Sequence, residues 1–246
     1  MARLYVPAER LDASELEVAG PEHHYLCRVL RLRPGDPVVL FDGQGHERDA
    51  QLIRVGPRSA TLRLSGRREV ALPSGPALTL LVGLAKGDKM DFIVQKATEL
   101  GVARIVPVLT ERSVIRPGER TRVAARQARW NKIAREAARQ CGRADVPAIA
   151  PVCPLGAALA AAPTGALRLL FWEQARAVKL RDLLPKAPPA QVVIAVGPEG
   201  GFSAAEAAAA QALGFVAVGL GSRTLRAETA ALAALAVVGY ALGMLE

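Results

Sequence analysis

The 246-residue sequence is poor in residues that bind metals or form disulfides, with three cysteines and three histidines. Cys27, Cys141 and Cys153 are scattered, and none belongs to a CxxC pair. This argues against a disulfide framework and against a structural zinc site. His23 and His24 are adjacent, so one face of a helix or strand cannot present both. We interpret them as a loop pair and expect no bound metal.

Long apolar segments are also missing. The first residues, MARLYVPAERLDASE, contain no apolar stretch of the kind found in a secretory signal. Residues 229–245 carry no charge, but they are fewer than the ~20 residues of a membrane span, and many are alanine or glycine. We therefore expect a buried helix there, and a soluble, cytoplasmic protein that does not bind membranes.

Positive charge is abundant. The formal net charge is +9, which favours a polyanionic partner such as nucleic acid. From Arg112 to Arg143 the basic residues far outnumber the acidic ones. Arg122, Arg126 and Arg129 share one face of a helix expected at 120–140. Like charges at this spacing need compensation, either from RNA phosphates or from acidic residues elsewhere in the fold.

Two domains are expected, at residues 1–72 and 73–246. The first has short strand-like segments at 37–41, 51–55 and 60–64 between turn residues, which predicts a small β-rich domain. In the second, apolar strands alternate with amphipathic helices, which is typical of an α/β fold with a mainly parallel sheet. Its predicted strands are 78–84, 104–108, 167–172, 192–196 and 215–220, and its predicted helices are 88–100, 120–140, 204–213 and 225–245.

Glycine loops follow two of these strands. Gly197-Pro-Glu-Gly-Gly201 comes directly after 192–196 and precedes Ser203-Ala-Ala-Glu206, a capping-box pattern. Gly221 and Ser222 follow 215–220. Parallel strands end at the same edge of a sheet, so the two loops predict a composite ligand pocket. Neither loop has the Walker or the GxGxxG spacing.

The two loop segments, Gly197-Pro-Glu-Gly-Gly-Phe-Ser203 and Leu220-Gly-Ser-Arg-Thr-Leu-Arg-Ala-Glu-Thr-Ala230, resemble the C-terminal signature of the RsmE family. These proteins are small-subunit rRNA (uracil-N3) methyltransferases of the SPOUT class. The resemblance covers nearly the whole chain. Further matching segments are Arg28-Val-Leu-Arg-Leu32, Phe41-Asp-Gly43, Lys86-Gly-Asp-Lys-Met-Asp91, Gln95-Lys-Ala-Thr-Glu-Leu-Gly101 and Glu136-Ala-Ala-Arg-Gln-Cys-Gly-Arg143.

The resemblance implies a PUA-like β-barrel at 1–72 and a SPOUT methyltransferase domain at 73–246, with a trefoil knot in about 167–246. It also implies S-adenosylmethionine as cofactor, a homodimer, and 16S rRNA of the small ribosomal subunit as partner. The residues that it places at the cofactor are Val196, Gly197, Pro198, Glu199, Gly200, Gly201, Leu220, Gly221, Leu225, Arg226, Glu228 and Thr229.

Candidate residues for the chemistry follow from the uracil base, whose N3 carries a proton at neutral pH. A site must remove that proton or stabilise the anion. Arg143 and Arg226 are candidates for stabilising the oxygens, Gln140 for binding the base edge, and Glu199 or Glu228 for accepting the proton. The candidates for RNA binding are Arg28, Arg31, Arg112, Arg122, Arg126, Arg129, Arg139 and Arg143.

Two alternatives remain open. A non-catalytic RNA-binding protein is disfavoured because RNA binding alone does not require the glycine loops. A ribose 2′-O-methyltransferase of the same class typically has an asparagine-to-arginine motif before the knot. Asn131, in the basic helix, is the single asparagine in the sequence, so that motif is missing.

Overall fold

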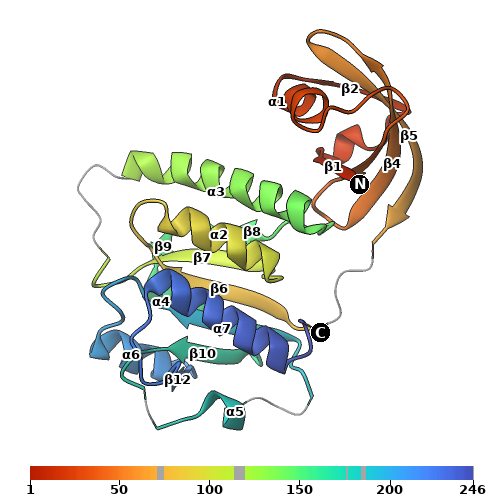
Figure 1. Cartoon of the computed structure of the whole chain (residues 1–246). Helices are drawn as coiled ribbons and strands as arrows, with labels where there is room; N and C mark the ends of the chain where they lie inside the picture. Colours follow the sequence, from red (N-terminus) through yellow and green to blue (C-terminus); the bar gives the residue numbers. More distant parts are fainter. Residues whose placement is uncertain (71–74, 114–119, 176, 184–186, 246) are drawn as a thin grey trace. The chain divides into compact units, whose positions relative to one another are not determined.

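The computed structural model describes residues 1–70, 75–113, 120–175, 177–183 and 187–245, with only the backbone described at 120–124 (Figure 1). Contacts divide the chain into two units. The first comprises Met1–Leu72 and Arg135–Val146, and the second comprises Pro73–Ala134 and Pro147–Glu246. Each unit is described by itself below.

The first unit is built on a five-stranded sheet with the order β1-β3-β4-β5-β2. Its strands are β1 (Ala2–Tyr5), β2 (Glu15–Ala19), β3 (Pro37–Phe41), β4 (His46–Val55) and β5 (Ser59–Glu69). β1 and β3 run parallel, and the other pairs are antiparallel. Alternate residues of these strands, such as Val38, Leu40 and Leu62, share one buried core. The expected β-rich N-terminal unit is confirmed.

Short helices lie between these strands: η1 (Ala8–Arg10) between β1 and β2, and α1 (Gly20–His23) and η2, a π-helix (His24–Val29), between β2 and β3. The interpretation of His23 and His24 as a loop pair is therefore wrong. Pro21 stands in the first turn of α1, a position that suits its fixed φ. His23 is buried, and its Nε2 lies 3.0 Å from the carbonyl oxygen of Gly56.

The second unit contains a parallel sheet with the order β12-β10-β11-β6-β7-β8, and β9 also pairs with β7. Its strands are β6 (Ala77–Gly83), β7 (Arg104–Leu109), β8 (Ala148–Ile149), β9 (Cys153–Pro154), β10 (Leu167–Phe171), β11 (Gln191–Val196) and β12 (Val216–Val218). β11 is apolar and buried from Val192 to Val196, as expected of a strand covered on both faces. The α/β class with a mainly parallel sheet is confirmed.

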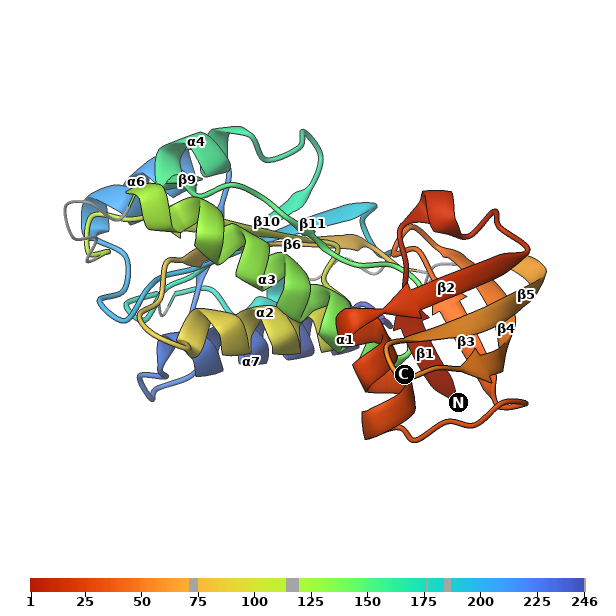
Figure 2. The same cartoon turned by 90° about the horizontal axis from the view of Figure 1, so that it is seen from above.

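Helices cover both faces of this sheet. The helices that follow β6 along the chain are α2 (Lys89–Glu99), α3 (Arg120–Cys141), α4 (Leu155–Ala160), α5 (Leu180–Leu183), α6 (Ala204–Ala212) and α7 (Ala227–Ala241), and the end of α3 from Arg135 onward belongs to the first unit. α2 and α7 lie side by side on one face, and α4 and α6 lie on the other (Figure 2). Leu81, Leu170 and Val193 of the sheet share a core with Leu159 of α4 and Ala207 of α6.

Every strand and helix predicted after residue 72 is present, with changed bounds. The last helix ends at Ala241 instead of Leu245, because Gly243 adopts a φ of +71° that helical residues do not have. β12 is shorter than predicted. Within the described part of the chain, no helix is long and apolar enough to cross a membrane.

Candidate functional site

A pocket lies at the carboxyl ends of three neighbouring parallel strands, β10, β11 and β12. Its cavity volume is about 140 Å³, and the pocket is partly open to solvent. The described residues that line it are Phe171, Trp172, Glu173, Val196, Gly197, Pro198, Glu199, Gly200, Gly201, Leu220, Gly221, Arg223, Thr224, Leu225, Ala227 and Ala230. The predicted meeting of the two glycine loops is present.

The loop between β11 and α6 is held by hydrogen bonds on both sides. Ser203 and Glu206 form the predicted capping box, in which the Ser203 hydroxyl accepts from the Glu206 backbone and the Glu206 carboxylate accepts from the Ser203 backbone. The other oxygen of this carboxylate accepts from the backbone of Glu111 at 2.7 Å. The Arg112 guanidinium donates to the carbonyl of Gly200 at 2.8 Å. These contacts fix the loop that forms one wall of the pocket.

Two glycines are required by close packing around this loop. A Cβ atom on Gly83, the last residue of β6, would lie 2.3 Å from the backbone nitrogen of Pro198. Gly201 has a φ of +66°, and a Cβ atom there would lie 2.7 Å from Oε1 of Glu173. Neither position accepts a side chain without movement of the loop or of Glu173.

Carboxylates give the pocket part of its charge. Oε1 of Glu199 accepts from the Lys86 backbone at 3.2 Å and from Nζ of Lys89 at 2.9 Å. Burial alone would raise the pKa of Glu199, but these hydrogen bonds and the Lys89 charge together lower it. Glu199 is therefore ionised at neutral pH, and Glu173 and Arg223 are the other charged residues of the lining.

The structure places the predicted cofactor residues in two groups. Nine of them line the pocket: Val196, Gly197, Pro198, Glu199, Gly200, Gly201, Leu220, Gly221 and Leu225. Arg226 is the N-cap residue of α7, and Glu228 and Thr229 lie in the first turn of that helix. Among the described residues that line the pocket, these three do not occur. Their role at the cofactor stays a prediction.

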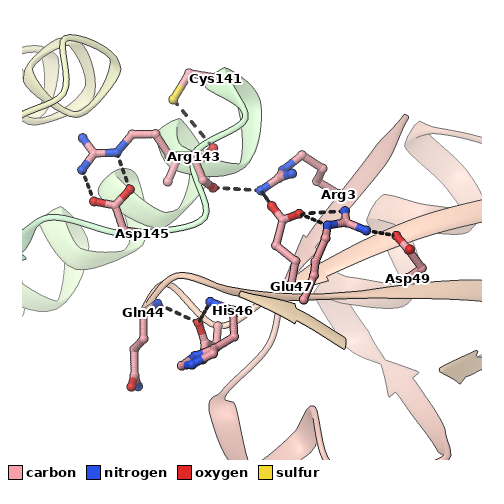
Figure 3. A network of polar contacts seen from close by, with 11 residues as sticks. Arg3, Gln44, His46, Glu47, Asp49, Cys141, Arg143 and Asp145 are labelled. Atoms are coloured by element: carbon pink, nitrogen blue, oxygen red, sulfur yellow. Dashed lines mark hydrogen bonds and ion pairs between the residues drawn. The ribbon is translucent and has the colours of Figure 1, made fainter. Parts of the chain in front are cut away.

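Arg143 and Gln140, predicted at the substrate base, belong to the first unit, whereas the pocket belongs to the second. Gln140 is exposed near the end of α3. The Arg143 guanidinium points toward the Asp145 carboxylate, with Nε 3.1 Å from Oδ1, and its backbone carbonyl accepts from Nη2 of Arg3 at 2.9 Å (Figure 3). Arg143 is thus held by an ion pair, and its role in catalysis stays a prediction.

The arginines predicted to bind RNA have different surroundings. Arg28 and Arg31 are exposed on the first unit, while the Arg139 guanidinium stacks 3.7 Å from the ring centroid of Tyr25. It also forms an ion pair with Glu136. Arg28 and Arg31 are therefore open to a phosphate.

On α3, the Arg129 guanidinium forms ion pairs with Asp91 and, at 3.4 Å, with Asp88. For Arg129 the compensating charge thus comes from acidic residues elsewhere in the fold, the alternative that the sequence left open. Arg126 is half-buried, and the side chain of Arg122 lies outside the described residues.

Sequence reasoning missed the pocket wall that follows β10. Phe171, Trp172 and Glu173 line the pocket because β10 lies between β11 and β12 and ends at the same edge. The strand at 167–172 was predicted, but no glycine loop follows it. The edge rule for parallel strands, applied to all strands of the sheet, would have indicated this third wall.

Family models match both parts of the chain. A model described as an RNA methyltransferase domain matches residues 73–239, and one described as an RNA methyltransferase PUA domain matches residues 18–65. The fold, the pocket and these two matches place the chain among the RNA methyltransferases.

Individual relatives identify the family more closely than the two domain models do. The chain is 36% identical over 240 residues to ribosomal RNA small subunit methyltransferase E of Synechocystis, covering 96% of this chain and 76% of that protein. The Bacillus subtilis protein of the same name is 30% identical, with 93% and 91% covered. A crystal structure of the Neisseria gonorrhoeae protein bound to S-adenosyl methionine is 36% identical, with a TM-score of 0.85 and 98% and 97% covered. The chain belongs to the ribosomal RNA small subunit methyltransferase E family.

Proposed function

We propose that this protein transfers the methyl group of S-adenosylmethionine to N3 of a uridine in the 16S RNA of the small ribosomal subunit. The observation that carries the proposal is the pocket in which two glycine loops meet at the carboxyl ends of β10, β11 and β12. The Neisseria gonorrhoeae relative was crystallised with the same cofactor. Activity on small-subunit RNA accords with the name that the relatives share.

The chemistry of the pocket fits S-adenosylmethionine. Gly197, Gly200 and Gly221 leave backbone groups accessible to a ligand. Phe171 and Leu225 offer apolar surface for an adenine ring. The carboxylates of Glu173 and Glu199 suit a ligand that carries a positive sulfonium and a positive ammonium group. When bound, the cofactor supplies an electrophilic methyl group.

On the substrate side, the protein must favour the deprotonated form of uracil N3. We assign Arg143 and Arg226 to the oxygens of the anion and Gln140 to the base edge. The lowered pKa of Glu199 makes it a weak proton acceptor, and Glu228 remains a candidate. Methyl transfer depends mainly on alignment of the two reactants and exclusion of water, so the proposal does not require a dedicated base.

RNA contacts are proposed for the exposed arginines of the first unit, led by Arg28 and Arg31, with Arg112, Arg122, Arg126, Arg129, Arg139 and Arg143 as further candidates. The net charge of +9 supports a polyanionic partner. We further propose that the protein acts in the cytoplasm on the small subunit or its RNA.

We also propose that the protein is a homodimer and that the chain forms a trefoil knot within about 167–246. Val237 and Tyr240 of α7 have 47% and 70% of their surfaces exposed, more than a helix buried in a monomer needs. A second copy of the chain covering this helix accounts for that exposure. Light scattering that finds a monomer at micromolar concentration contradicts the dimer.

The activity is tested by incubating the protein with S-adenosylmethionine and either small subunits or their RNA, followed by digestion to nucleosides and mass spectrometry. The expected product is 3-methyluridine, and cells lacking the protein should lose one methyl group at one uridine. A 2′-O-methylated nucleoside would instead indicate a ribose methyltransferase. RNA binding without any methylated product would indicate a non-catalytic protein.

A further inference from the structure

Lys89, the first residue of α2, lies between two carboxylates from segments far apart in the sequence. Its Nζ is 2.9 Å from Oε1 of Glu199 and 3.9 Å from Oε2 of Glu228. Glu199 lines the pocket, and Glu228 stands between Ala227 and Ala230, which line it too. One ammonium group therefore joins the β11–α6 loop to the first turn of α7.

The carboxylate of Glu228 is largely buried, and the contact with Lys89 stabilises its charge. Its side chain is 17% exposed, and its Oε2 atom is buried without a hydrogen-bond partner in the described part of the chain. A buried carboxylate oxygen without a hydrogen bond is unfavourable, and the N-terminal position in α7 offsets that only in part. Lys89 is the cation that the structure records beside it.

The other charged groups of α2 near this point are engaged elsewhere. Asp88 and Asp91 form their ion pairs with Arg129. Glu199 and Glu228 therefore share the single positive charge of Lys89. The cluster of these three residues carries a net charge of about −1 when both carboxylates are ionised.

We propose that Lys89 is a positioning residue that holds Glu199 and Glu228 as a pair of ionised carboxylates beside the pocket, and that this pair makes the pocket prefer the cationic cofactor to its product. The proposal rests on the function proposed above. S-adenosylmethionine carries a positive charge on sulfur, and S-adenosylhomocysteine does not. Ionised carboxylates beside the pocket stabilise the first ligand more than the second.

Removal of Lys89 separates a positioning role from a structural one. Without the ammonium group, two like charges face each other, so the state in which both carboxylates of the pair are ionised becomes less favourable. The preference for the cationic ligand then weakens as the pH falls. Loss of packing alone would weaken both ligands equally at every pH.

The experiment measures the dissociation constants of S-adenosylmethionine and S-adenosylhomocysteine by calorimetry at pH 6, 7 and 8, using the full-length protein. In the parent, the ratio of the two constants should not change with pH. In Lys89→Met, the preference for S-adenosylmethionine should fall about three- to tenfold between pH 8 and pH 6. Lys89→Arg should behave as the parent does, because it keeps the charge.

Two further variants complete the test. Lys86→Met removes an equal charge from an exposed side chain but keeps the backbone donor to Glu199, so it should match the parent. Glu228→Gln should show the weakened preference at every pH. A Lys89→Met variant whose ratio stays constant with pH would overturn the inference. A parent that binds neither ligand would overturn the proposed function, and this inference with it.

Discussion

Arg112 and Gly200 are joined by a hydrogen bond in which Nη1 of the arginine donates to the glycine carbonyl at 2.8 Å. The two residues also pack closely, since a Cβ atom on Gly200 would lie 2.9 Å from the Cβ atom of Arg112. Arg112 was predicted from the sequence to hold an RNA phosphate. Its observed contact is with the wall of the pocket, which adds a role in shaping the β11–α6 loop.

Replacing Arg112 with alanine should weaken binding of S-adenosylhomocysteine about three- to tenfold, because the loop loses a charged hydrogen-bond donor. Calorimetry measures the change, and circular dichroism checks that the fold is kept. Arg181→Ala is the matched control, because Arg181 is exposed on α5, and α5 contributes no residue to the lining. Unchanged affinity in the Arg112 variant would show that the loop does not need this contact.

Replacing Gly83 with alanine should destabilise the protein by about 1–3 kcal/mol, because the new methyl group meets backbone atoms that have little room to move. The nearest are the nitrogen of Pro198 at 2.3 Å and the carbonyl carbon of Gly197 at 2.8 Å. Since both belong to the pocket wall, cofactor affinity should fall as well. Urea denaturation and calorimetry measure the two effects.

The control for Gly83 is Gly156→Ala. Gly156 lies in α4, and nothing lies within 4 Å of an added Cβ atom. This change should stabilise the protein by about 0.5–1 kcal/mol, because alanine loses less backbone entropy than glycine in a helix. Equal effects of the two substitutions would refute the steric explanation.

Asp42 should give the first unit a pH-dependent contribution to stability. Its carboxylate accepts from the backbone of Gln44 at 2.7 Å, and from the backbone and ring of His46 at 3.2 and 2.8 Å. Burial would raise the pKa of Asp42, but these hydrogen bonds and the nearby His46 lower it. The stabilisation is therefore complete above the unfolded pKa of about 3.9 and is lost as the pH falls through the lower folded value.

Asp42→Asn should consequently lower the free energy of unfolding by about 1–3 kcal/mol at neutral pH. The difference in stability between the variant and the parent should shrink below about pH 4. Denaturant titrations over a pH series measure it. Asp12→Asn is the control, since Asp12 is exposed and pairs with an exposed Arg67, so its effect should be small at every pH. If Asp42→Asn lowers the stability by the same amount down to about pH 3, Asp42 is not the source of a pH-dependent stabilisation.

Two arginines should differ in how they affect RNA binding. Arg28 is exposed, so Arg28→Ala should weaken binding and reduce the salt slope by about one unit or less. Arg129 already pairs with Asp88 and Asp91, so Arg129→Ala should change the slope less. Binding to small-subunit RNA over a salt series tests both. A larger change for Arg129 than for Arg28 would reverse the proposed order.

The core strands and helices of the second unit were predictable because their patterns are local. An uninterrupted apolar run indicates β11, and buried Met90, Ile93 and Ala97 recur on one face of α2. β2 gives a weaker local signal, because only Leu16 and Val18 of its five residues are buried. It exists through pairing with β5, which lies far along the sequence.

The part of the pocket formed by local motifs was predictable in the same way. The two glycine loops follow strands, so their meeting at one edge could be inferred. Glu173 and Lys89 carry no comparable motif. Glu173 lines the pocket because of the strand order, and Lys89 of α2, which packs against α7, contacts the lining residue Glu199. The Asp partners of Arg129 likewise come from another helix, so spacing within α3 does not indicate them.

The order of the lining residues along the chain has a consequence for synthesis. The pocket draws on segments from Phe171 to Ala230, so its walls come from the last third of the chain. While a ribosome is still translating that third, the nascent chain has the first unit but no complete ligand site. The pocket is therefore complete only after Ala230 has been translated, and a chain that stops before Gly197 lacks the β11–α6 loop that forms one of its walls.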